Sequence, residues 1–71
     1  MKEQLIQLIR AVPFVPFSVS LKNGEVLAVK SVELIGVGAQ LFFFVDPTGL
    51  ICHYRINSIH HLAIRETEIN L

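Results

Sequence analysis

Apolar residues near the N-terminus recur at the spacing of a helix. Leu5, Leu8 and Ile9 follow the i, i+3, i+4 pattern that forms one apolar stripe. Pro13 cannot continue a helix, and the residue before a proline favours extended geometry. The pattern therefore predicts an amphipathic helix over about residues 2–12, with its apolar stripe packed against the rest of the chain.

After the helix, the pattern predicts an extended segment and then a hairpin. The proline-rich segment 13–17 lacks the amide donors of a regular strand, so it is an edge or a lead-in. Apolar and polar residues then alternate over residues 17–22, as in a half-buried strand. Asn23-Gly24 predicts a two-residue type I′ turn into a second strand over residues 25–29.

A two-residue loop also fixes how the two predicted strands pair. Val19 faces Ala28, and the side chains of Leu21 and Val26 lie on the same face as this pair. Leu27 and Val29 then lie on the second face of the hairpin.

The middle of the chain is less regular. Within residues 31–39, Gly36 and Gly38 indicate a bend, a bulge or a close approach of the backbone. Residues 40–45 contain three consecutive phenylalanines and predict a strand that is buried on both faces.

A second hairpin and a last short strand complete the pattern. Asp46-Pro47-Thr48-Gly49 fits a type I turn, with Asp at its first position and Gly at its fourth. Residues 50–56 return as the partner strand, and residues 59–64 form a last strand. A short tail follows over residues 65–71.

These elements predict one domain that is mainly β. The helix precedes a β-barrel over about residues 14–64, and this order is typical of a small five-stranded SH3-like or Sm-like barrel. The alternative is an open, strongly bent antiparallel sheet with the helix packed over one end.

Composition adds self-association to this picture. The chain has 71 residues, of which 52% are hydrophobic and only 17% are charged, and ordinary domains carry about 25% charged residues. A domain this small has a limited core, so a homo-oligomer is the simplest way to cover the excess apolar surface. The apolar residues of the third and fourth predicted strands are the candidate oligomer interface: Leu41, Phe42, Phe43, Phe44, Leu50 and Ile51.

Charge and cysteine content bear on partners and location. Six basic and six acidic residues give a net charge of zero, which argues against broad binding of polyanions. Cys52 is the single cysteine, so no disulfide forms within the chain, and we expect a cytoplasmic protein. The longest apolar stretch, residues 32–45, is too short and too interrupted to span a membrane, and the N-terminus does not resemble a signal peptide.

The residues that carry chemistry do not form a catalytic or metal-binding pattern. His60 and His61 are neighbours on a predicted strand and therefore point to opposite faces, which leaves a cross-strand pair with His53 as the alternative. Cys52 matches no nucleophile motif, and a lone cysteine in a strand is usually buried. We expect no catalytic residues, no metal and no cofactor.

Four polar or aromatic residues near the last strands are candidates for contact with a ligand. An aromatic ring and a guanidinium beside histidines can stack on nucleobases and donate hydrogen bonds to them. The candidate contacts for single-stranded RNA are Tyr54, Arg55, His60 and His61. The alternative is an ordinary strand in which Tyr54 is buried and Arg55 is solvated.

The sequence resembles a group of small bacterial proteins that have no established activity. These proteins begin with a short amphipathic helix followed by a Pro-Phe-x-Pro-Phe signature, which here is residues 13–17. Residues 21–24, then Asp46 and Gly49, also match. The resemblance implies a shared fold.

The sequence more distantly resembles Sm-like proteins of the Hfq type. Residues 19–27 are similar to their first motif, and Tyr54-Arg55 is similar to the start of their second. Val29 stands where the first motif continues with glycine, and Ile56 where the second has histidine. The resemblance implies a helix followed by a bent five-stranded barrel, assembly into rings and binding of RNA.

Together these observations predict a module that acts by binding rather than by catalysis. We expect a homo-oligomeric Sm-like barrel with single-stranded RNA as a candidate ligand, and with neither a membrane nor a small-molecule substrate as a partner. The alternative is a protein-interaction or assembly domain with no role in nucleic-acid binding.

Overall fold

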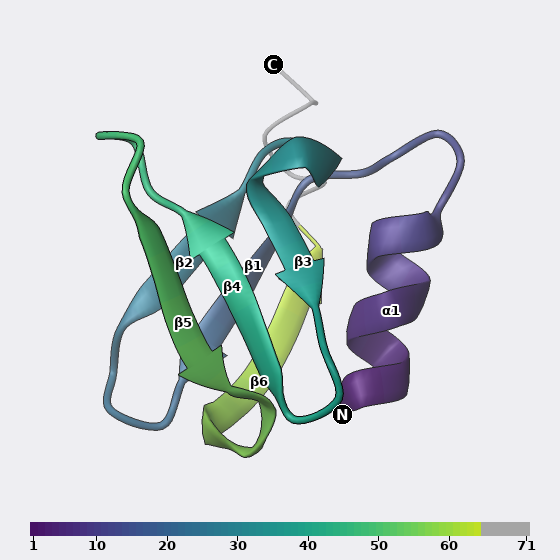
Figure 1. Cartoon of the computed structure of the whole chain (residues 1–71). Helices are drawn as coiled ribbons and strands as arrows, with labels where there is room; N and C mark the ends of the chain where they lie inside the picture. The colour runs from purple at the N-terminus through teal and green to yellow at the C-terminus, as the bar shows by residue number, and fades with distance from the viewer. Residues whose placement is uncertain (65–71) are drawn as a thin grey trace.

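The computed structural model describes residues 1–64, in which one α-helix precedes six β-strands and two short 3-10 helices (Figure 1). The elements in order are α1 (Lys2–Arg10), β1 (Phe17–Leu21), β2 (Val26–Val29), η1 (Val32–Leu34), β3 (Ile35–Val37), β4 (Leu41–Val45), β5 (Ile51–Arg55), η2 (Ile56–Ser58) and β6 (Ile59–Ile64). The predicted tail, residues 65–71, lies outside the described residues. The prediction of a mainly β fold with an N-terminal helix is confirmed.

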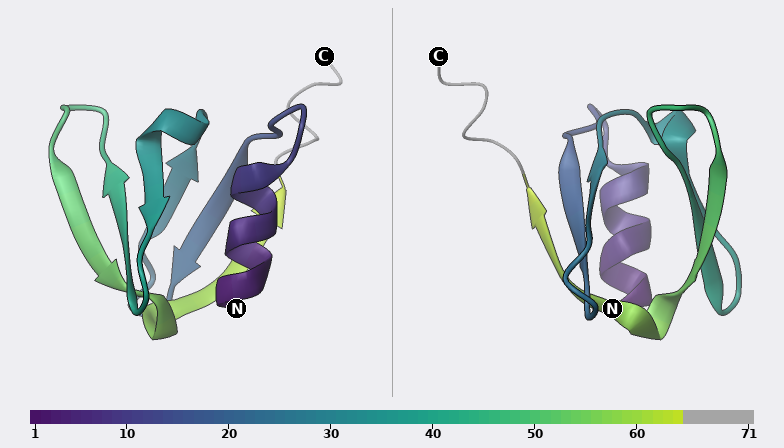
Figure 2. Two further views of the ribbon diagram at one scale, coloured as in Figure 1. Left: turned by 45° about the vertical axis from the view of Figure 1, so that its right-hand side comes forward. Right: turned by 90° about the vertical axis from the view of Figure 1, so that its left-hand side faces the viewer.

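The strands form two antiparallel sheets of three strands each. One sheet has the order β2-β1-β6 and the other has the order β3-β4-β5. The sheets face each other across the interior (Figure 2), and within residues 1–64 neither closes into a barrel. The five-stranded barrel is therefore not confirmed. The strand that the sequence did not predict is β3, which lies in the segment 31–39 that the pattern left unassigned.

The helix ends earlier than the sequence pattern predicts. It stops at Arg10, because Ala11 already has extended backbone angles (φ −62°, ψ 139°). Leu5 is fully buried, and Leu8 and Ile9 pack against the same core. The prediction that the apolar stripe of the helix faces the rest of the chain is confirmed.

The helix lies on one of the two open sides of the sheet pair. Its residues share one surface depression with Val37 and Gly38 at the end of β3, and another with Leu62 and Ile64 of β6. α1 therefore covers the side between the free edges of β3 and β6. In the described part of the chain no helix covers the opposite side, where β2 and β5 lie (Figures 1 and 2).

The β1–β2 hairpin has a three-residue loop, not the predicted two-residue loop. The Leu21 amide donates to the Glu25 carbonyl (2.8 Å), and the Gly24 amide donates to the Leu21 carbonyl (3.0 Å). Gly24 has φ +95°, whereas no residue other than glycine has positive φ in residues 1–64. This is a type I turn followed by a glycine bulge. Asn23 stabilises it through its side chain, because its Oδ1 accepts a hydrogen bond from the Glu25 amide (2.9 Å).

The extra loop residue shifts the predicted pairing of the hairpin by one position. Val19 lies opposite Leu27, and Phe17 lies opposite Val29. A shift of one residue moves every side chain of a strand to the other face. Leu27 and Val29 are therefore buried in the core, and Val26 is 60% exposed. The predicted register, with Val26 on the buried face, is wrong.

The strand with three phenylalanines is buried on one face only. Phe42 and Phe44 are buried, whereas Phe43 is 40% exposed. The strand alternates because β4 is the middle strand of a sheet that has the core on one side and solvent on the other. The prediction that residues 40–45 are buried on both faces is wrong for the single chain.

The β4–β5 hairpin has the predicted type I turn. The Gly49 amide donates to the Asp46 carbonyl (2.9 Å), and the Asp46 amide donates to the Leu50 carbonyl (2.9 Å). Gly49 has φ +91°, so this loop also ends in a glycine bulge. The Asp46 carboxylate accepts hydrogen bonds from the Thr48 amide, the Thr48 hydroxyl and the Leu50 amide (2.9, 2.6 and 3.0 Å).

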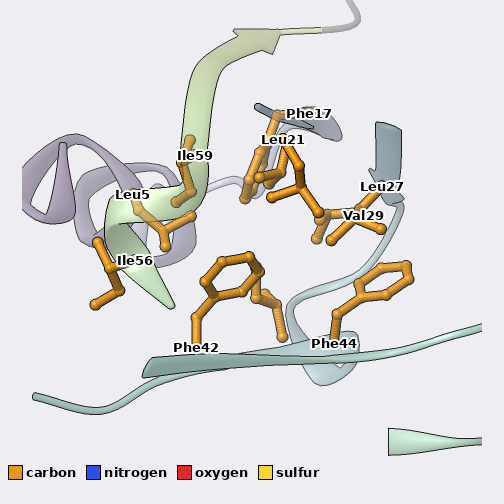
Figure 3. Packing of buried hydrophobic residues seen from close by; sticks show 11 residues of the cluster. Leu5, Phe17, Leu21, Leu27, Val29, Phe42, Phe44, Ile56 and Ile59 are labelled. Carbon is orange, nitrogen blue, oxygen red and sulfur yellow. The ribbon is translucent and has the colours of Figure 1, made fainter. Parts of the chain in front are cut away.

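The core lies between the two sheets and is closed at one end by α1 and η2. Figure 3 shows Phe42 and Phe44 pointing from β4 towards the side chains of β1 and β2, with Leu5 and Ile56 beside them. The buried apolar side chains are Leu5, Phe17, Val19, Leu21, Leu27, Val29, Ile35, Phe42, Phe44, Ile56 and Ile59.

α1, the longest helix among the described residues, has nine residues and is too short to cross a membrane.

Candidate interaction surfaces

The outer face of the β3-β4-β5 sheet carries apolar side chains that the chain itself does not cover. The strand register places Phe43 opposite His53, and Val45 opposite Ile51. Ile51 is 61% exposed, and Leu41 is 45% exposed. We call this surface the apolar outer face; its members on β4 and β5 are Leu41, Phe43, Val45 and Ile51.

A glycine on β3 provides the space that Phe43 occupies. Gly36 lies directly opposite Phe43 in the β3–β4 ladder. The Phe43 ring lies over Gly36 so closely that a Cβ atom there would overlap the ring. Of the alternatives that the sequence offered for Gly36, the structure shows a close approach to the backbone. The Phe43 ring also packs near His53, with ring centroids 6.1 Å apart.

The predicted oligomer interface is divided between the surface and the core. Four of its six residues are exposed, namely Leu41, Phe43, Leu50 and Ile51. Phe42 and Phe44 are core residues, because alternate side chains of a strand point to opposite faces. The predicted interface must be corrected by removing these two residues.

The outer face of the β2-β1-β6 sheet has a different character. Ser18 lies between Ala28 and Ala63, and Ser20 lies between Val26 and His61. Val26 is the one large apolar side chain exposed on the strands of this face in the described residues.

Tyr54 and Arg55, predicted as neighbours in one ligand site, point to opposite faces of β5. The Tyr54 ring stacks on Phe42, with centroids 5.3 Å apart and 24° between the ring planes. Its hydroxyl donates to Oε2 of Glu25, the residue before β2, at 3.5 Å. Burial and the nearby Glu25 carboxylate raise the pKa of Tyr54 above its ordinary value. Because it stacks on Phe42, this face of the Tyr54 ring is not available to a ligand.

Arg55 lies in a shallow depression near the start of α1. The depression has a volume of about 370 Å³ and is also lined by Met1, Lys2 and Asn57. The Lys2 ammonium donates to the Ala39 carbonyl at 3.1 Å, which holds this second cation close to the depression. Sequence reasoning missed Lys2, because residues 2 and 55 meet only through the fold.

The two adjacent histidines lie together on β6. The β1–β6 register shifts between Ser20 and Leu21, so His60 is the extra residue of a bulge. The bulge brings the His60 and His61 ring centroids to 5.1 Å, instead of the predicted opposite faces. His61 Nε2 lies 3.4 Å from the Ser20 hydroxyl. No hydrogen bond or aromatic contact in residues 1–64 joins either histidine to Tyr54 or Arg55.

The remaining candidates for chemistry lie apart from one another. Cys52 is half-buried on the inner side of β5, opposite Phe44. His53 lies on the apolar outer face. In the described part of the chain, no three His, Cys, Asp or Glu side chains are close enough to share a metal ion.

Comparisons of the chain with models of protein families, with curated proteins and with solved structures find no match.

Proposed function

We propose that the protein is a non-enzymatic assembly module that forms a homo-oligomer through the apolar outer face. The observation that carries this proposal is the exposure of Phe43, Leu41 and Ile51 on one face of one sheet. Monomeric proteins rarely leave a large contiguous apolar patch in water, and such a patch is typical of an interface. The aromatic ring of Phe43, held over Gly36, suits the centre of the contact.

The arrangement of the strands supports an Sm-like form of this module. β2 and β3 are separated only by a short segment that includes η1, and they lie in different sheets. If they are counted as two halves of one bent strand, the chain has a helix and five strands around one core. η2 then makes the short connection to the last strand, β6.

The test is the molar mass of the protein in solution, measured by light scattering over a range of concentrations. We expect a mass that is a multiple of the 8.0 kDa chain. Phe43→Ser and Ile51→Ser should each weaken the association by about tenfold or more, as expected at the centre of an interface. Val26→Ser is the matched control, because Val26 is as exposed as Ile51 but lies on the other sheet.

Two results would contradict the proposal. One is a monomeric mass for the unmodified protein at high micromolar concentration. The other is an equal loss of association in the Val26→Ser control, which would show that exposed apolar side chains in general, and not this face, promote the contact. Circular dichroism of each variant checks that the fold is retained.

A second candidate function is weak binding of single-stranded RNA at the depression beside Arg55. The observation that favours it is the presence of two cationic side chains, Arg55 and Lys2, at one place on a chain of zero net charge. Such a site contacts few phosphates, so its affinity should change little with salt concentration. The inward position of Tyr54 removes base stacking on that ring from this candidate.

A further inference from the structure

The open side of the sheet pair, opposite α1, contains a groove along β2. The groove has a volume of about 640 Å³. Its lining includes Leu27 and Phe44, which belong to the core, and also Val26 and Pro47. The groove shares one lining residue, Val45, with the outer face through which we propose that the protein assembles, whereas Leu41, Phe43 and Ile51 lie outside it.

The edge of β2 in this groove carries unpaired backbone groups. β2 is an outer strand of its sheet. The hydrogen bond from Leu21 to Glu25 makes these two residues a hydrogen-bonded pair, and such pairs alternate along an antiparallel ladder. The backbone groups of Val26 and Ala28 therefore point away from β1 and into the groove. A row of unpaired amides and carbonyls is a template for another strand.

Charged residues lie at both ends of this edge. Glu25 precedes β2 and accepts a hydrogen bond from the Tyr54 hydroxyl, and Lys30 follows β2. Asp46 also lines the groove, and its carboxylate, which accepts three hydrogen bonds within its own turn, adds a second negative charge to the lining. The β2 strand itself is thus flanked by an acidic residue at its start and a basic residue at its end.

We propose that this groove binds an extended peptide, which adds to β2 as an antiparallel strand. The peptide backbone pairs with Val26 and Ala28, and its alternate apolar side chains lie over Leu27 and Phe44. An acidic residue at its N-terminal end lies near Lys30, and a basic residue five positions later lies near Glu25. Main-chain hydrogen bonds give such strand addition its affinity, and side-chain pockets give it specificity.

The experiment uses the full chain and two synthetic hexapeptides, followed by amide chemical shifts in NMR. The probe is acetyl-Glu-Val-Thr-Val-Thr-Lys-amide, and the control is the charge-reversed acetyl-Lys-Val-Thr-Val-Thr-Glu-amide. We expect the probe to shift the amide signals of Val26 and Ala28 in a saturable way. The control should bind about fivefold more weakly, because it places like charges beside Glu25 and Lys30 at the two ends of β2.

Two variants test the mechanism directly. The double variant Glu25→Lys/Lys30→Glu should reverse the preference between the two peptides. Ala28→Pro should abolish binding, because it removes an amide that faces the groove and that the β1–β2 ladder does not use. If Ala28→Pro does not fold, the charge-swapped variant still decides the question.

Several outcomes would overturn the proposal. The first is the absence of shifts at Val26 and Ala28 at millimolar peptide. Others are equal binding of both peptides or shifts confined to β5 or β6. If dilution of the protein alone shifts the same signals, a second copy of the chain occupies the groove, and the proposal of a peptide partner is wrong.

Discussion

The two sheets share one core and one kind of hairpin turn, but their outer faces differ. The outer face of β2-β1-β6 carries mostly serine, alanine and histidine, as is usual for a sheet face in water. The outer face of β3-β4-β5 carries Leu41, Phe43 and Ile51. Of the five large apolar side chains exposed on the described strands, these three lie together on one face. This asymmetry is the basis of our proposal that the protein assembles through this face.

The largest expected effect compares neighbouring phenylalanines on the two faces of one strand. Phe42→Ala removes a fully buried ring and should cost about 3–5 kcal/mol of stability. Phe43→Ala removes a partly exposed ring and should cost about 1 kcal/mol or less. Urea unfolding at low protein concentration, where association does not contribute, measures both changes. Equal losses would show that the outer face is as well packed as the core.

The second prediction tests whether the two hairpins are equivalent. Gly24→Val and Gly49→Val should each destabilise the fold by about 1–2 kcal/mol, because an L-residue resists positive φ. Thermal or urea unfolding gives both values. Gly38→Ala is the control, since Gly38 lacks positive φ and has no atom closer than 3.4 Å to an added Cβ. A neutral Gly24→Val variant would contradict the glycine bulge in the β1–β2 loop.

The positions of these turns show what the sequence predicted well. Hydrophobic periodicity located α1, and turn residues located both hairpins. The pattern did not give the length of the first loop, because Asn-Gly fits either a type I′ turn or the end of a type I turn with a bulge. That single residue decided which side chains of β2 are buried. Here Asn23 stabilises the longer loop through its own side chain.

Other features depend on contacts between residues far apart in the sequence. The close approach of Phe43 to Gly36 requires the pairing of β3 with β4, which the pattern of residues 31–39 did not reveal. The bulge at His60 depends on the partner strand β1. The depression that joins Arg55 to Lys2 forms only when the start of α1 reaches η2. Periodicity describes each strand separately and so does not predict these neighbours.

The third prediction concerns the two faces of β5 in RNA binding. Arg55→Ala should weaken binding of short single-stranded RNA severalfold, whereas Tyr54→Phe should leave it unchanged, because the tyrosine ring is stacked on Phe42. Titration of labelled RNA at two salt concentrations measures the affinity and its dependence on salt. The absence of binding at tens of micromolar protein would eliminate RNA as a ligand and leave the assembly module as proposed.

The smallest expected effect distinguishes the two hairpin turns by their response to pH. Hydrogen bonds from the Thr48 side chain and from the Leu50 amide hold the pKa of Asp46 below its ordinary value of 3.8. Because the pKa is lowered in the folded state, the carboxylate stabilises the fold at pH values above 3.8. That contribution is lost as the pH falls through the lower pKa of the folded state. The corresponding turn in the other sheet uses Asn23, which does not titrate.

Asp46→Asn should therefore be less stable than the unmodified protein near neutral pH. The difference should shrink in strong acid, where both side chains are uncharged. Urea midpoints of the two proteins at about pH 7 and about pH 2 measure this. Asn23→Asp is the matched control, because it places a carboxylate in the same kind of turn and should add a pH dependence there. A difference between Asp46→Asn and the unmodified protein that does not change with pH would show that the hydrogen bonds, and not the charge, stabilise this turn.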